Sequence, residues 1–166
     1  MNICEINKEN VQEIAEKLNK NDIEQLFNLI ETKDRCVAFP VLSYRSRIES
    51  DVYPYWDKIA KMLGNENSFV KTIGLKLIAN NTKWDKNKKL NINEYLKLCD
   101  DSSLVVSRAC IQSLEEILNN TKFNSMIVES ITKKLSTFDV QKRPETHKNV
   151  LKKDIDYIIK LIKNKK

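Results

Sequence analysis

The chain has 166 residues, with only two glycines and three prolines among them, and a formal net charge of +6. So little glycine and proline leaves few positions for hairpins, which argues against a β-rich fold and indicates an all-helical protein. The longest apolar run, Cys36 to Leu42, is far shorter than the about 20 residues that a membrane-spanning helix needs. The first ten residues hold acidic side chains and no apolar run, so they do not resemble a secretory signal. We therefore expect a single domain over residues 1–166, located in the cytoplasm and without a membrane segment.

Apolar residues recur at helical spacing along most of the chain. A short helix is predicted over residues 9–18. Four two-helix units are predicted after it: Asp22–Glu31 with Asp34–Ser50, Pro54–Leu63 with Ser68–Asn81, Ile92–Cys99 with Ser103–Leu118, and Ser125–Leu135 with Thr146–Lys163. Pro40 lies inside the second helix of the first unit. Because a proline ring clashes with the preceding turn of a helix, we expect a kink or a break near Phe39.

One apolar pattern occurs twice in the chain, with a shift of 36 residues. A valine, Val70 in one copy and Val106 in the other, is followed four positions later by a small residue, Gly74 or Cys110. Repeats of this length are typical of units that cannot bury their apolar faces alone and therefore stack. The last predicted helix has a narrower apolar stripe with lysines opposite, so we expect it to cap the stack. This register predicts a buried core that includes Val70, Ile73, Leu77, Val106, Cys110, Leu114, Ile155 and Ile158.

On this pattern the chain resembles the HEAT-repeat proteins of the armadillo-like α-solenoid class, in which Val-Arg is followed by a small residue and then by leucine. The matching residues are Val70-Lys71 with Gly74 and Ile78, and Val106 with Cys110 and Leu114; in the second copy Ser107 takes the arginine position and Arg108 follows one place later. The resemblance implies an all-α fold, a right-handed α–α superhelix of about four two-helix units whose second helices line the concave face. It implies no reaction, so we expect a non-enzymatic protein-binding or scaffold module with a protein partner.

The residues most suited to contact that partner are basic or aromatic side chains of the predicted concave face and of nearby turns. They are Arg45, Arg47, Lys71, Trp84, Arg108, Lys148 and Lys152. The two arginines of the first unit belong to an aromatic cluster, Tyr44-Arg45-Ser46-Arg47 followed by Tyr53-Pro54-Tyr55-Trp56, which suits gripping a peptide or stacking on bases. Core packing also explains most of this cluster and leaves Arg45, Arg47 and Tyr55 for contacts.

The net charge is concentrated at one end of the chain. Residues 140–166 hold nine basic and three acidic side chains, whereas residues 1–139 hold twenty of each. A basic surface favours nucleic acid or an acidic partner, so a nucleic-acid binder is one alternative function. The other interpretation is codon usage in an AT-rich genome, because Lys, Asn and Ile together make up 60 of the 166 residues. We favour the codon-usage interpretation.

No catalytic, metal or cofactor motif is apparent. His147 is the single histidine, and no serine, cysteine or second histidine stands at a motif spacing from it, so no catalytic residues, metal site or cofactor are predicted. The cysteines form no CxxC motif, and Cys36 and Cys110 lie on apolar helix faces, where we expect them to be buried as small hydrophobic residues without disulfides.

Trp84-Asp85 opens a lysine-rich turn, and in this respect the chain is similar to HEAT-like alkylpurine DNA glycosylases. That resemblance implies Trp84 and Asp85 as site residues and Arg108 as a phosphate contact, in an active or degenerate repair enzyme. The family's second acid, four residues after the tryptophan, is replaced here by Lys88. We therefore expect Trp84 to pack the turn, the lysines to be solvated, and the chain to have no glycosylase activity.

Overall fold

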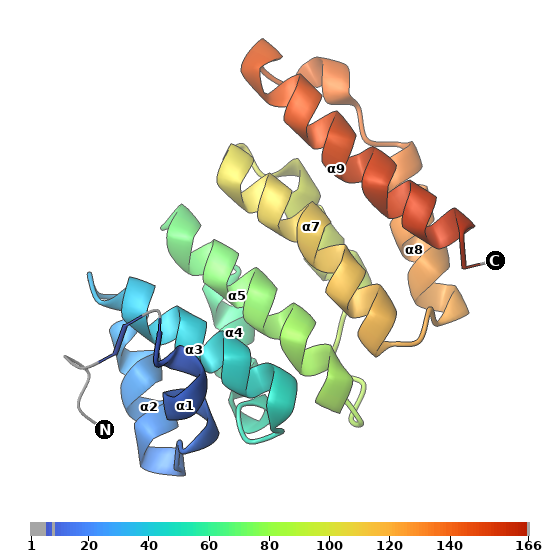
Figure 1. Cartoon of the computed structure of the whole chain (residues 1–166). Helices are drawn as coiled ribbons and strands as arrows, with labels where there is room; N and C mark the ends of the chain where they lie inside the picture. The colour runs from blue at the N-terminus through green and yellow to red at the C-terminus, as the bar shows by residue number, and fades with distance from the viewer. Residues whose placement is uncertain (1–5, 8, 166) are drawn as a thin grey trace.

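The computed structural model describes residues 6–7 and 9–165, and all regular structure within them is helical (Figure 1). These residues form nine α-helices: α1 Val11–Glu16, α2 Lys20–Leu29, α3 Arg35–Ile48, α4 Trp56–Met62, α5 Ser68–Asn81, α6 Ile92–Leu96, α7 Leu104–Asn120, α8 Ser125–Ser136 and α9 Glu145–Lys163. Short 3-10 helices supplement them: η2 Tyr53–Tyr55, η3 Thr82–Trp84, η4 Lys97–Asp100 and η5 Val140–Lys142. The prediction of an all-helical fold is confirmed, and each predicted helix has its counterpart.

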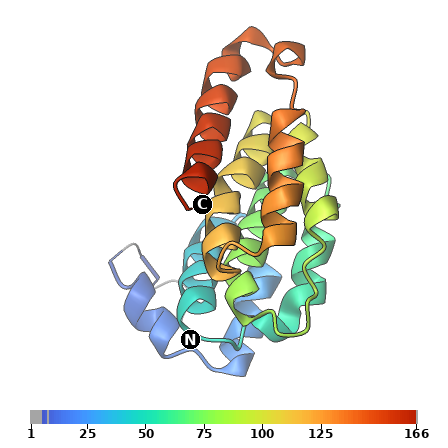
Figure 2. The same cartoon turned by 90° about the vertical axis from the view of Figure 1, so that its right-hand side faces the viewer.

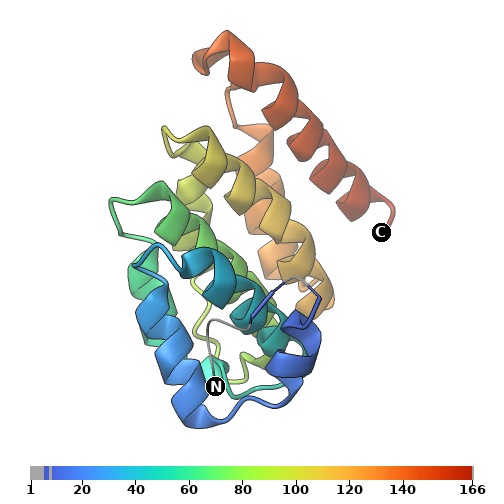
Figure 3. The same cartoon turned by 60° about the vertical axis from the view of Figure 1, so that its left-hand side comes forward.

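The helices form two layers. In Figure 1, α3, α5, α7 and α9 lie side by side as a row and run in the same direction. Figure 2 shows α4, α6 and α8 as a second layer along one side of this row, and α2 packs against α3. The short α1 also packs on α3, at the N-terminal end of the row (Figure 3). We call the side of α3, α5, α7 and α9 that is turned away from the second layer the outer face.

Apolar side chains between the layers form one continuous core that extends from α1 to α9. All eight residues predicted from the repeat register are buried, and Leu77, Val106, Leu114 and Ile158 are completely so. The register inferred from the sequence is therefore confirmed. Such a core stabilises the fold because roughly 25 cal/mol is gained for each Å² of apolar surface removed from water.

The small residue of the repeat marks a close approach between helices. A Cβ atom added to Gly74 would lie 2.8 Å from the Cβ of Met62 and 3.3 Å from the carbonyl oxygen of Ile59, both on α4. In the second copy, Cys110 takes this position and packs on Cys99 of η4. The valine followed by a small residue therefore marks the place where α5 packs closely on α4 and where α7 packs closely on η4.

Two expectations from the sequence need correction: a break of the chain near Phe39 and the burial of Cys36. The chain does not break near Phe39, because α3 continues through Pro40 from Arg35 to Ile48. A proline removes only one backbone donor, and α3 is held on several sides by α1, α2 and α5. Cys36 is exposed rather than buried. It lies in the first turn of α3, on the opposite side of the helix from the buried Ala38 and Leu42.

Candidate functional site

Arg45, one of the predicted contact residues, joins three segments of the fold. Its Nη1 donates to the carbonyl oxygens of Ala15 and Glu16 at the end of α1, both at 2.9 Å. Its Nη2 donates to Asp51 at 2.6 Å, and the side chain is only 12% exposed. The hydrogen bond with Asp51 raises the pKa of Arg45, and the cation also suits the negative end of a helix. Arg45 therefore holds α1 against α3 and has little surface left for a partner.

Three other predicted contact residues are in ion pairs. Lys71 Nζ lies 2.8 Å from Asp101, in the loop before α7. Arg108 Nε lies 2.8 Å from a carboxylate oxygen of Asp154 on α9. The remaining pair is that of Lys148 Nζ with Glu145 Oε2, at 2.8 Å within the first turn of α9. The positive charges of these three side chains are therefore largely balanced by neighbouring carboxylates.

Lys152 is exposed on α9, but it lies away from Arg108. Lys152 and Asp154 are two positions apart, which corresponds to about 200° around a helix axis. Because Asp154 meets Arg108, Lys152 is on nearly the opposite side of α9. The structure therefore does not bring these two predicted residues together.

The turn that contains Trp84 and Asp85 is held by its own hydrogen bonds. Trp84 donates its indole N–H to the carbonyl oxygen of Ser46 at 2.7 Å. The Asp85 carboxylate accepts from the Tyr53 hydroxyl at 2.8 Å and from two backbone N–H groups, those of Lys89 at 2.8 Å and Leu90 at 2.9 Å. A carboxylate that accepts three hydrogen bonds in this way holds the loop in shape, and both of its oxygens are already occupied by these donors.

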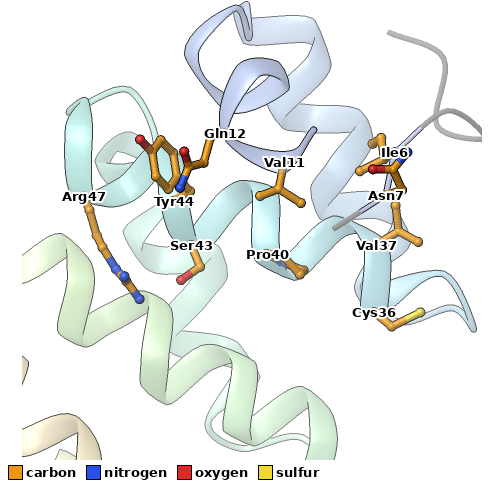
Figure 4. A pocket seen from close by; sticks show the side chains of 10 residues that line it. All are labelled: Ile6, Asn7, Val11, Gln12, Cys36, Val37, Pro40, Ser43, Tyr44 and Arg47. Atoms are coloured by element: carbon orange, nitrogen blue, oxygen red, sulfur yellow. The ribbon is translucent and has the colours of Figure 1, made fainter. Parts of the chain in front are cut away.

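Arg47, like Lys152, differs from the paired cations above. It is exposed on α3, and its guanidinium forms no ion pair with any residue that the structure describes. It lies at one end of a groove that α3 forms with α1 and with Ile6 and Asn7 before it (Figure 4). The groove has a volume of about 450 Å³. The groove is lined by Ile6, Asn7, Val11, Gln12, Cys36, Val37, Pro40, Ser43, Tyr44 and Arg47.

The groove follows from the spacing of residues on α3. Cys36, Pro40, Ser43 and Arg47 stand at positions i, i+4, i+7 and i+11, so they form one stripe along the helix. In Figure 4 the stripe runs from Cys36 at one end to Arg47 at the other, with Val11 of α1 above its middle. The central part is apolar, and most of the polar groups are at the two ends.

Exposed apolar side chains also lie on the outer face of the three further helices of the row. Phe69 on α5 is 61% exposed, Val105 on α7 is 48% exposed, and Tyr157 on α9 is 51% exposed. Helical geometry places Phe69 opposite Gly74, which rests on α4, and Val105 opposite Cys110, which rests on η4. Sequence reasoning missed both, although they occupy the same position of the 36-residue repeat.

The outer face carries charges of both signs around these apolar residues. Lys76 lies over the ring of Phe39 at 5.6 Å from its centroid. Glu115 accepts a hydrogen bond from the Tyr157 hydroxyl at 2.7 Å. Together with the pair of Arg108 and Asp154, these groups make the face mixed in charge rather than continuously basic.

Comparison of the chain with protein-family models, with curated proteins and with solved structures gives no match. Among the residues that the structure describes, no three His, Cys, Asp or Glu side chains are grouped so that they could hold a metal ion. In the same part of the chain, no helix has the combination of length and hydropathy that crossing a bilayer requires.

Proposed function

We propose that the chain is a HEAT-like α-solenoid of four two-helix units, acting as a non-enzymatic protein-binding or scaffold module whose concave side is the outer face. The observation that carries this proposal is the set of exposed apolar side chains, Phe69, Val105 and Tyr157, on three successive helices of one face. Aromatic and aliphatic groups among polar ones are the composition of protein interfaces.

The helix contacts support the solenoid part of the proposal. Within the proposed units, α2 packs on α3, α4 on α5, η4 on α7 and α8 on α9. Along the row, α3 contacts α5, α5 contacts α7, and α7 contacts α9. This is the nearest-neighbour arrangement by which repeat proteins build an extended binding surface.

The charges favour a protein partner over nucleic acid on this face. Nucleic-acid binding relies on cations that are free to neutralise phosphates. On or beside the outer face, Arg108 is paired with Asp154 and Lys71 with Asp101, and Glu115 adds a negative charge. A protein surface with apolar and mixed polar groups is a better complement.

Site-specific cross-linking tests the proposal. A photoreactive benzoylphenylalanine at position 69 should cross-link a protein in lysate of the source cell, and Val105→Glu should abolish that cross-link because it places a charge in the same apolar surface. Position 126 is the matched control, since Met126 is 74% exposed but lies on α8 in the other layer. Cross-links of the same protein from position 126, or cross-links from position 69 that Val105→Glu leaves unchanged, contradict the proposal.

Nucleic-acid binding remains the second candidate function because of one observation on α9. Lys152, Lys153, Lys160 and Lys163 are exposed there, and none forms an ion pair with a residue in the described part of the chain. The repair-enzyme alternative has less support, because the oxygens of Asp85 are occupied by donors of its own loop.

A further inference from the structure

The groove between α1 and α3 has the composition of a ligand site. Its volume of about 450 Å³ falls within the usual range for binding pockets, roughly 300–1,000 Å³. Val11, Val37 and Pro40 provide apolar lining, and the groove is partly open to solvent. An open groove of this kind suits a chain that lies across the surface better than a small molecule enclosed on all sides.

One end of the groove presents polar groups without partners. At this end Gln12 lies beside the ring of Tyr44, and Arg47, one turn further along α3, extends its side chain away from them (Figure 4). Their side chains form no hydrogen bond or ion pair with the residues that the structure describes, in contrast to Arg45, which is fully engaged two positions earlier on the same helix. A free guanidinium is a planar fork that fits a carboxylate through two parallel hydrogen bonds.

The length of the groove matches a short extended peptide. Cys36 and Arg47 are eleven positions apart on α3, which corresponds to about 16 Å at the rise of an α-helix. An extended peptide covers about 3.3 Å per residue, so about five residues span that distance.

We propose that this groove binds an extended segment of about five residues from a partner protein, in which aliphatic side chains precede a carboxylate. The aliphatic side chains pack on Val11, Val37 and Pro40, and the carboxylate pairs with Arg47. The inference rests on the proposed protein-binding function and names the chemistry of one segment of the partner. The carboxylate is that of an acidic side chain or of the partner's own C-terminus.

Fluorescence anisotropy with three labelled pentapeptides of the same aliphatic sequence tests the proposal. One peptide ends in a free carboxylate, one in glutamate with an amidated C-terminus, and one in glutamine with an amidated C-terminus. We expect at least one of the two acidic peptides to bind at least about tenfold more tightly than the glutamine peptide, and Arg47→Glu to remove that difference. Lys86→Glu, at an exposed lysine of the α5–α6 turn, is the matched control and should leave binding unchanged.

Cys36 gives a second readout at the opposite end of the groove. In a Cys4→Ser background, the exposed Cys36 thiol should react with a thiol reagent at least about threefold more slowly when an acidic peptide is bound, since the peptide covers that end. The buried Cys99 and Cys110 do not interfere. Circular dichroism and thermal unfolding of Arg47→Glu show whether that variant is folded.

Equal affinity for the acidic and glutamine peptides, no binding of any peptide at millimolar concentration, or unchanged binding by a folded Arg47→Glu would each overturn the proposal. Protection of Cys36 by dodecanoate without protection by any peptide would instead identify a lipid site. The cross-linking experiment on Phe69 and Val105 does not depend on Arg47. If the peptide experiments fail and the cross-linking experiment succeeds, the peptide proposal is wrong and the proposed protein-binding function is retained.

Discussion

The thiol sulfurs of Cys99 and Cys110 lie 3.4 Å apart in the interior, where η4 meets the middle of α7. Both side chains are completely buried. Burial raises the pKa of the Cys110 thiol, and the neighbouring Cys99 raises it further. Since the thiolate is the reactive form of cysteine, Cys110 should be unreactive in the folded protein, and burial shields Cys99 from reagents as well.

Thiol labelling checks this expectation. In a Cys4→Ser variant at pH 8, Cys36 should react with a maleimide within minutes, while Cys99 and Cys110 should react only after denaturant is added. Mass spectrometry of the labelled peptides distinguishes the three sites. Modification of Cys110 at the same rate as Cys36 in the native protein would mean that the contact between η4 and α7 opens readily.

The repeat register predicts a large effect of Leu114→Ala on stability. Leu114 is completely buried in α7, so its truncation should lower the free energy of unfolding by roughly 2–5 kcal/mol. Val105→Ala, on the exposed side of the same helix, is the control and should change stability by less than about 0.5 kcal/mol. Urea denaturation measures both, and equal effects of the two variants would contradict the register.

The two glycines offer a matched pair of substitutions. Gly74→Ala places a Cβ 2.8 Å from the Cβ of Met62, so it should destabilise the protein by about 1–3 kcal/mol through overpacking. At Gly64 the only atom near an added Cβ is the Lys61 carbonyl oxygen, at 3.8 Å. Gly64→Ala should therefore be neutral, or stabilising by up to about 1 kcal/mol through the unfolded state. Thermal unfolding of the two variants compares them directly, and a Gly74→Ala variant as stable as Gly64→Ala would exclude the close packing of α5 on α4.

The ion pair of Lys71 and Asp101 should make the free energy of unfolding depend on pH. Burial alone would raise the pKa of Asp101, but hydrogen bonds from Lys71 and from the Ser103 backbone outweigh it and hold that pKa below its ordinary value of 3.8. A carboxyl group with a lowered pKa stabilises the folded state above its unfolded pKa, and that contribution is lost as the pH falls through the folded pKa.

The variant Asp101→Asn tests whether this carboxylate stabilises the folded state and whether that stabilisation is lost at low pH. The variant should be less stable than the unchanged protein at pH 7, and the difference should shrink as the pH is lowered from about 5 to 2. Chemical denaturation at pH 7, 4 and 3 gives the three differences. A difference that stays constant over this range would show that the charge of Asp101 contributes nothing to stability.

The lysines of α9 allow a test of the nucleic-acid alternative. If codon usage accounts for them, DNA and RNA should bind only non-specifically, at about 10⁻⁴ M or weaker at physiological salt. If they serve nucleic acid, affinity should fall steeply with salt, with a log–log slope of about −0.9 per phosphate contacted on duplex DNA. Titrations at low and physiological salt distinguish the two, with Lys152, Lys153 and Lys160 changed to Glu in parallel. Micromolar binding that the triple variant loses would favour the nucleic-acid function over the protein-binding one.

Local patterns in the sequence were sufficient to predict the helices and much of the core. An α-helix makes its hydrogen bonds within one segment, and its buried side shows as apolar residues at a spacing of three and four. For this reason Leu114 and Ile158 could be identified as core residues from the sequence. The position of the small residue in the repeat, Gly74 or Cys110, was also visible, although its contact with α4 or η4 was not.

The candidate site depended on contacts between distant segments. Arg45 and Arg47 stand two positions apart on α3 and look equivalent in the sequence. Only the position of α1, together with Asp51, decides that Arg45 is enclosed by hydrogen bonds while Arg47 stays free beside the groove. Likewise, the pairing of Arg108 with Asp154 joins residues 46 positions apart. The helical period determines which side of a helix a residue occupies, whereas the charges and carbonyl groups opposite that side are determined by tertiary packing.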